Sequence, residues 1–322
     1  MLLKKRKGWE IPEKHVTPKN IWLERRNFIK SLNIMGATFL SKYFFGINRL
    51  NAKPVDGFPA WKNNKYVLNE KYTDKEIAYS YNNYYEFGSS KNIWRQSQKL
   101  KTDPWKIIIN GLVESDIEID VYDLIRKIGP MEERIYRFRC VEAWSMVLPW
   151  TGVPLKNFVK FANPKSSAKF IQMETFFDES IAPGQKQDWY PWPYTEGITI
   201  DEATNDLAFL ATGLYGENLK NQNGAPIRLM LPWKYGFKNL KGIVKFTFTD
   251  IQPTGMWEKL SPKEYGFWAN VNPNVSHPRW SQKMEKVVGQ DLEQETLIYN
   301  GYERQVTSLY QKYSHLGASL FR

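Results

Sequence analysis

The 322-residue chain is long enough for one large domain or two ordinary ones, and its 42% hydrophobic content excludes a disordered protein. The net charge of +11 does not indicate nucleic-acid binding, because most of it lies before residue 53, where eleven Lys and Arg stand against three Glu. The single cysteine, Cys140, excludes an intramolecular disulfide, and the three histidines form no zinc-site pattern.

Residues 1–52 have the layout of a cleavable export signal. Arg25 and Arg26 precede an apolar stretch, 31–40, that is too short and too often interrupted by polar residues to span a membrane stably. A basic region, this stretch and the small residue Ala52 follow in the order of a signal peptide. The paired arginines are typical of the twin-arginine route to the periplasm, which carries folded proteins. The alternative is an amphipathic surface helix.

The rest of the chain, residues 53–322, predicts short helices and strands in mixed order. Its first part, 53–92, reads as loop and short helix. Strands are then expected at 105–113, 135–141, 168–176, 227–231 and 242–250. Helices are expected from Asp120 as N-cap to Ile128, at 154–162, at Ile200–Ala211 after the cap Thr199, and near 303–313. This mixture predicts a single α+β domain with mixed sheets.

Cys140 is the residue most suited to chemistry. It follows Arg134, Arg137 and Arg139, and nearby cations favour a thiolate over a thiol. A soft thiolate is a natural ligand for a high-valent molybdenum centre. The alternative is that Cys140 is a small buried hydrophobe, which is the usual role of a lone cysteine.

The sequence around Cys140 resembles that of a known family. Arg-Phe-Arg-Cys-Val-Glu-Ala-Trp-Ser-Met-Val at 137–147 and Pro-Trp-Thr-Gly-Val-Pro-Leu at 149–155 are similar to the molybdenum-ligand segment of the sulfite-oxidase fold family. More narrowly, they resemble the catalytic subunits of periplasmic protein-methionine-sulfoxide reductases. The resemblance extends over nearly the whole chain, and includes the leader and the motifs at 81–87, 173–175, 221–228 and 232–238.

The resemblance implies a sulfite-oxidase-type molybdopterin-binding domain with one Mo-molybdopterin per chain and no attached nucleotide. Cys140 is then the metal ligand, and Asn83 and Glu142 lie near the metal as catalytic residues. The implied cofactor-binding residues are Asn82, Tyr85, Glu86, Thr175, Asn223, Arg228, Asn239, Leu240 and Lys241.

These residue types suit the cofactor. Asn side chains and backbone donors match the edges of a pterin, and Arg228 or Lys241 matches its phosphate. The turn at 221–224 can present backbone N–H groups to an anion. Asn239 departs from the family, which usually has a small residue there, and this is tolerable if its contact comes from the backbone.

The implied activity is reduction of methionine sulfoxide in oxidised periplasmic proteins. Electrons would come from a membrane haem-binding subunit fed by quinol, and export would use the twin-arginine translocon. Two alternatives remain open. The same fold could oxidise sulfite or reduce small S- or N-oxides. The second alternative is that the chain is an exported, aromatic-rich protein that binds glycans or peptides without a metal, with Cys140 merely buried.

Overall fold

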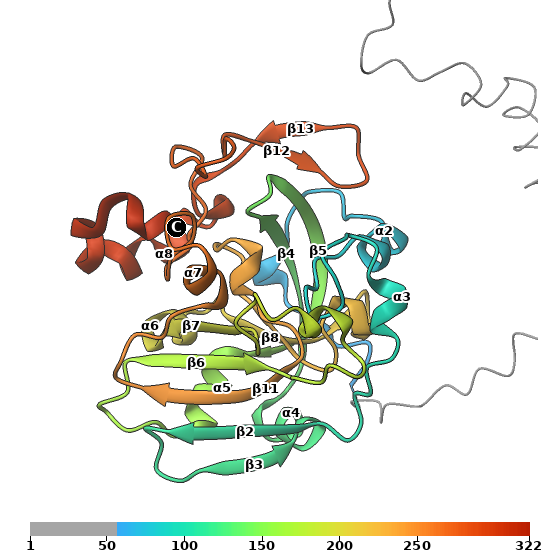
Figure 1. The fold of residues 1–322 in the computed structure, drawn as a ribbon, viewed down its shortest axis with the longest axis vertical. Helices are drawn as coiled ribbons and strands as arrows, with labels where there is room; N and C mark the ends of the chain where they lie inside the picture. Colours follow the sequence, from blue (N-terminus) through green and yellow to red (C-terminus); the bar gives the residue numbers. More distant parts are fainter. Residues whose placement is uncertain (1–56) are drawn as a thin grey trace, which may run out of the picture. The chain divides into compact units, whose positions relative to one another are not determined.

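The computed structural model describes residues 57–322, and the predicted export signal at 1–52 lies outside the described residues. The described part forms two mixed sheets connected by short helices (Figure 1), which confirms the predicted α+β class. Within residues 57–322, no helix combines the length and the apolar character that a membrane crossing requires.

The larger sheet is built around the long antiparallel pair β4 (Glu132–Cys140) and β5 (Trp144–Pro154). β5 also pairs antiparallel with β8 (Phe209–Leu214) and parallel with β12 (Met284–Val287). Short strands complete this sheet, namely β1 (Trp61–Lys62) beside β4, β9 (Glu217–Asn218) and β10 (Arg228–Met230) beside β8, and β13 (Glu293–Glu295) beside β12.

The second sheet has five strands in the order β3-β2-β11-β6-β7. Only β2 and β11 pair in parallel among these strands. Burial alternates along β2, where Ile107 and Ile109 are buried and Ile108 is exposed. The strands are β2 (Lys106–Gly111), β3 (Ile117–Asp120), β6 (Phe170–Thr175), β7 (Thr195–Thr199) and β11 (Ile243–Thr249).

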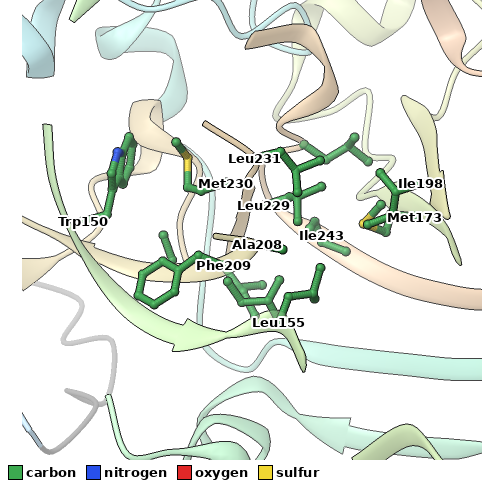
Figure 2. Packing of buried hydrophobic residues seen from close by; sticks show 14 of the residues in the cluster. Trp150, Leu155, Met173, Ile198, Ala208, Phe209, Leu229, Met230, Leu231 and Ile243 are labelled. Atoms are coloured by element: carbon green, nitrogen blue, oxygen red, sulfur yellow. The ribbon is translucent and has the colours of Figure 1, made fainter. Parts of the chain in front are cut away.

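The main core lies where apolar side chains of the two sheets meet. Figure 2 shows Trp150 and Phe209 of the larger sheet packed in one cluster with Met173, Ile198 and Ile243 of the smaller one. Each fully buried large apolar side chain contributes about 1.5–3 kcal/mol to folding. The helices of the described part are α2 (Lys75–Ser80), α3 (Trp94–Ser97), α4 (Val121–Ile128), α5 (Leu155–Ala162), α6 (Ile200–Thr204), α7 (Met256–Leu260) and α8 (Glu303–Tyr310).

Most predicted elements are present with small shifts at their ends, but the predicted helix Ile200–Ala211 is wrong. Thr199 does cap a helix, and it forms a capping box with Glu202. The helix ends at Thr204, because Asn205 accepts a hydrogen bond from the backbone of Leu207 and turns the chain. The following apolar residues are fully buried and form β8 instead.

A buried polar network attaches α8 to the interior. The Nζ of Lys234 lies 2.5 Å from Oε1 of Glu202, and both side chains are fully buried. The hydroxyl of Tyr310 donates to the same carboxylate over 2.7 Å and accepts a hydrogen bond from Nε1 of Trp233 over 2.6 Å. Each of these buried polar groups therefore has a partner.

We expect Lys234→Met to lower the free energy of unfolding by about 3–5 kcal/mol, because Glu202 is left buried without its cation. The control Lys312→Met removes an exposed ion pair with Asp201, and such pairs contribute at most about 1 kcal/mol. Urea denaturation measures both changes. Equal losses in the two variants would contradict this account of the network.

Candidate active site

A cavity of about 490 Å³ opens at the turn between β4 and β5. Its wall combines the segment 81–86, this turn, Thr175 at the end of β6, and residues between 223 and 241. The structure brings together in this cavity every residue that the family resemblance singles out: Asn82, Asn83, Tyr85, Glu86, Cys140, Glu142, Thr175, Asn223, Arg228, Asn239, Leu240 and Lys241.

Cys140 is held by the geometry of the hairpin. It is the last residue of β4 and pairs with Trp144, the first residue of β5. Ala143 adopts a positive φ of 62° and donates its N–H to the carbonyl of Cys140 over 3.1 Å, which closes a tight turn. Trp280 and Gln282 each donate to the carbonyl of Val141 over 2.8 Å. The thiol is therefore fixed at the cavity wall, with only 5% of the residue exposed.

As predicted, Arg139 acts to lower the pKa of the Cys140 thiol, but the arginines do not decide its protonation state. Burial raises the pKa of the Cys140 thiol to about 12, and the nearby carboxylate of Glu142 acts in the same direction. Side chains alternate along a strand, so Arg137 and Arg139 point away from the face that carries Cys140. The guanidinium groups pair with other carboxylates, Arg134 with Glu132, Arg137 with Glu70 and Arg139 with Glu285.

Asn83 and Glu142 form a polar cluster beside the thiol. Nδ2 of Asn83 lies 3.5 Å from Sγ of Cys140 and 3.1 Å from Oε2 of Glu142. Lys91 donates to both side chains, and Trp144 donates to Glu142 over 3.0 Å. Burial opposes ionisation of Glu142, but these hydrogen bonds outweigh it and lower its pKa. Sequence reasoning missed Lys91, because no local pattern marks an ion pair between distant segments.

The inner part of the cavity carries two cations. Arg228 donates to the carbonyl of Asn223 over 2.9 Å and lies over the ring of Trp150 at 4.8 Å. Lys241 lies over the ring of Tyr84 at 5.4 Å. Neither cation takes part in any ion pair found among residues 57–322. Burial lowers the pKa of both groups, so a bound anion would be favourable here.

A close approach of the backbone shapes this inner part. Gly224 has a φ of 102°, and a Cβ at this position would lie 2.8 Å from side-chain atoms of Lys241. A larger residue would therefore displace that cation. Nearby, the side chain of Asn239 accepts a hydrogen bond from the N–H of Leu231 over 2.5 Å. The side chain of Asn239 is thus engaged within the protein, and its backbone N–H also donates to the carbonyl of Gly236 over 3.0 Å.

Several buried polar atoms of the cavity wall have no partner within the described residues. They are Oδ1 of Asn82, the hydroxyl of Tyr84, Nε1 of Trp150, Oδ1 of Asn223 and Nε of Arg228. Unpaired buried polar groups are uncommon in proteins, because each one destabilises the folded state. This concentration of donors and acceptors around one cavity fits a polar, anionic ligand with several hydrogen-bonding edges.

The outer part of the cavity is aromatic rather than charged. Tyr85, Tyr190, Trp257 and Tyr265 line it. The rings of Tyr85 and Trp257 pack edge to face with centroids 4.8 Å apart. Arg279, an exposed cation at this end, forms an ion pair with Glu264 over 2.8 Å. The opening is therefore nearly neutral.

We expect Cys140 to resist alkylation in folded protein produced without molybdopterin, because the thiolate is the reacting form. At pH 8 iodoacetamide should react on the order of 10³-fold more slowly than with the urea-unfolded chain, whose thiol titrates near about 8.5. The raised pKa also implies a folded-state rate that still increases tenfold per pH unit between roughly pH 8 and 10. Mass spectrometry follows the reaction, and a plateau near pH 9 would contradict the assignment.

Comparisons with known proteins agree with this geometry. Residues 95–257 match the family model of the oxidoreductase molybdopterin binding domain. The chain is 42% identical over 315 residues to the protein-methionine-sulfoxide reductase catalytic subunit MsrP of Burkholderia mallei, with 94% of each chain covered. The protein of the same name from Campylobacter jejuni is 45% identical over 301 residues, which cover 92% of this chain and 97% of that relative.

Among solved structures, the sulfane dehydrogenase SoxCD from Paracoccus pantotrophus is similar with 22% identity and a TM-score of 0.39, over 47% of this chain and 40% of that chain. The family model covers strands β2 to β11 of the two sheets, which confirms the predicted molybdopterin-binding fold. Because the identity to the reductase subunits extends over nearly the whole chain, this protein belongs to the family of protein-methionine-sulfoxide reductase catalytic subunits.

Proposed function

We propose that this chain reduces methionine sulfoxide in proteins, at a molybdenum that is held by molybdopterin and by Cys140. The relatives that cover nearly the whole chain are named for this reaction. The observation that carries the proposal is a lone thiol beside a carboxylate that is partly open to solvent. Glu142, whose Oε2 lies 3.8 Å from Sγ of Cys140, has a side chain that is 31% exposed. A side chain of another protein can therefore reach this point.

The donor set of the cavity suits molybdopterin. Arg228 and Lys241 would hold the phosphate, because they are enclosed cations without ion-pair partners in the described part. Asn82 and Asn223 would bind the pterin through oxygens that lack partners. Tyr85, Glu86, Thr175 and residues 239–241, which line the same cavity, would complete the binding site. When bound, the cofactor supplies two-electron oxygen-atom chemistry at sulfur.

The protein's own groups would orient the substrate and deliver protons. Asn83 can donate a hydrogen bond from Nδ2 to a sulfoxide oxygen placed beside the thiol. Reduction of a sulfoxide to a thioether consumes two electrons and two protons and releases water. Lys91, half-buried and bonded to Glu142, connects this carboxylate with solvent. The pair therefore provides a short path for protons to the reaction centre.

Sulfite oxidation is the alternative that the electrostatics disfavour. Sulfite is a small dianion, and its binding would call for unpaired cations next to the metal. Lys91 is neutralised by Glu142, and Arg279 at the opening is neutralised by Glu264. The unpaired cations Arg228 and Lys241 are assigned to the cofactor phosphate. A neutral sulfoxide fits the opening better than a dianion does.

We further propose that residues 1–52 are a twin-arginine signal that is removed after export to the periplasm, and that 53–322 form the mature enzyme. The paired arginines and the apolar stretch after them support this. The relatives are named catalytic subunits, which supports a separate electron donor. We propose a membrane haem-binding subunit fed by quinol in this role.

The first test is the metal content of protein made in a host that assembles molybdopterin. Wild-type protein should contain near-stoichiometric molybdenum by elemental mass spectrometry, and Cys140→Ser should lose most of it, because the thiolate is the protein's ligand. Wild-type protein should also reduce protein-bound methionine sulfoxide with an artificial electron donor and leave sulfite unchanged. Metal-free wild-type protein, or a preference for sulfite, would refute the proposal.

A second test concerns the phosphate contact. Lys241→Met should weaken retention of molybdopterin about tenfold, because one charged hydrogen bond to the anion is lost. Lys245→Met is the matched control, since Lys245 lies nearby on β11 but pairs with Glu174 over 3.0 Å outside the cavity. Fluorescence of the released pterin measures the content. Equal retention by both variants would argue against Lys241 as a phosphate ligand.

A further inference from the structure

An exposed tryptophan stands beside the cavity on the loop between β6 and β7. Trp189 is 64% exposed. Its ring lies 6.0 Å from the ring of Tyr190, which in turn lies 6.1 Å from Trp257. Tyr190 and Trp257 line the cavity, and Trp257 contacts Tyr85. Trp189 thus connects the protein surface with three rings at the cavity wall, Tyr190, Trp257 and Tyr85, which contact one another. These four side chains are here called the aromatic row.

The loop that carries Trp189 is tied to the cavity wall. Gly184 donates its N–H to the carbonyl of Glu86 over 2.8 Å, and a Cβ on Gly184 would lie 2.0 Å from the carbonyl oxygen of Tyr85. Gln185 donates to the carbonyl of Phe176 over 2.7 Å. The part of the loop that precedes Trp189 is therefore anchored to the cavity wall.

We propose that the aromatic row binds the polypeptide segment that flanks the oxidised methionine of a substrate protein. This inference rests on the proposed function. A methionine sulfoxide placed beside Cys140 remains attached to its main chain, so the neighbouring residues must cross the rim of the cavity. The row begins at this rim and extends outward from it.

The spacing of the row suits an extended peptide. Alternate side chains of an extended chain lie roughly 6.6 Å apart, close to the 6.0 and 6.1 Å between successive ring centroids. Large aromatic surfaces bind apolar and sulfur-containing side chains with little loss of conformational entropy. The expected partner is thus an unfolded or exposed segment with apolar residues next to the oxidised methionine.

The test compares two substrates that carry the same reacting group. One is an unstructured synthetic peptide with a central methionine sulfoxide between leucines, and the other is free methionine sulfoxide. In the molybdenum-loaded enzyme, Trp189→Ala should raise KM for the peptide roughly tenfold, as for loss of an aromatic interface contact. The kcat for the peptide and the kcat/KM for free methionine sulfoxide should stay unchanged, and Trp189→Phe should restore most of the peptide affinity.

Trp61 provides the matched control, because it is 65% exposed but lies far from the cavity. It pairs with Glu132, at the other end of the nine-residue strand β4 from Cys140, roughly 25 Å away. Trp61→Ala should leave both substrates unaffected.

An unchanged KM for the peptide in Trp189→Ala, or an equal loss of kcat/KM with free methionine sulfoxide, would overturn this inference. The proposed function would still stand as long as the wild-type enzyme is active. A wild-type enzyme that reduces neither substrate would overturn both.

Discussion

The pairing of Cys140 with Trp144 across a three-residue turn is the constraint on which the site depends. It sets the only cysteine at the tip of the longest hairpin of the described chain, between the inner, cationic part of the cavity and its aromatic opening. The same turn sets Glu142 beside the thiol, and Trp144 then holds Glu142 by a hydrogen bond. A shift of one residue in this register would turn Cys140 to the opposite face of the sheet.

The cavity separates two kinds of recognition. Its inner part has enclosed cations and polar atoms without partners, which suits a fixed cofactor that is bound once and kept. Its opening has aromatic side chains and ion-paired charges, which suit a substrate that binds weakly and dissociates after the reaction. The two parts meet at Cys140, Asn83 and Glu142. In the proposed function, the reaction would take place at the boundary between the polar cofactor site and the aromatic opening.

The sequence predicts regular amphipathic elements well and fails where tertiary context decides. Helix α4 follows directly from its cap and its apolar face. β5 could not be predicted, because it is buried on both faces and shows no alternation. The helix after Thr199 is too long in the prediction, because pairing with β5 overrides local preference in the residues of β8.

Site residues within long motifs are found by resemblance, and the structure brings them to one cavity. Groups that act across the chain are not found this way. Lys91 reaches Glu142 from a distant segment, and no local pattern marks such a pair. The arginines before Cys140 influence its thiol less than predicted for a related reason. Closeness in sequence says little about an interaction when neighbouring side chains on a strand point to opposite faces.

The paired charges at the opening have a consequence for the range of clients. A cation such as Arg279, neutralised by Glu264 within 2.8 Å, projects little field into solvent beyond a Debye length. Encounter with a substrate protein is then governed by ordinary diffusion rather than by electrostatic steering, and depends little on ionic strength. The paired charges therefore do little to select between acidic and basic substrate proteins. Such indifference to charge suits an enzyme that repairs damage wherever oxidation happens to occur.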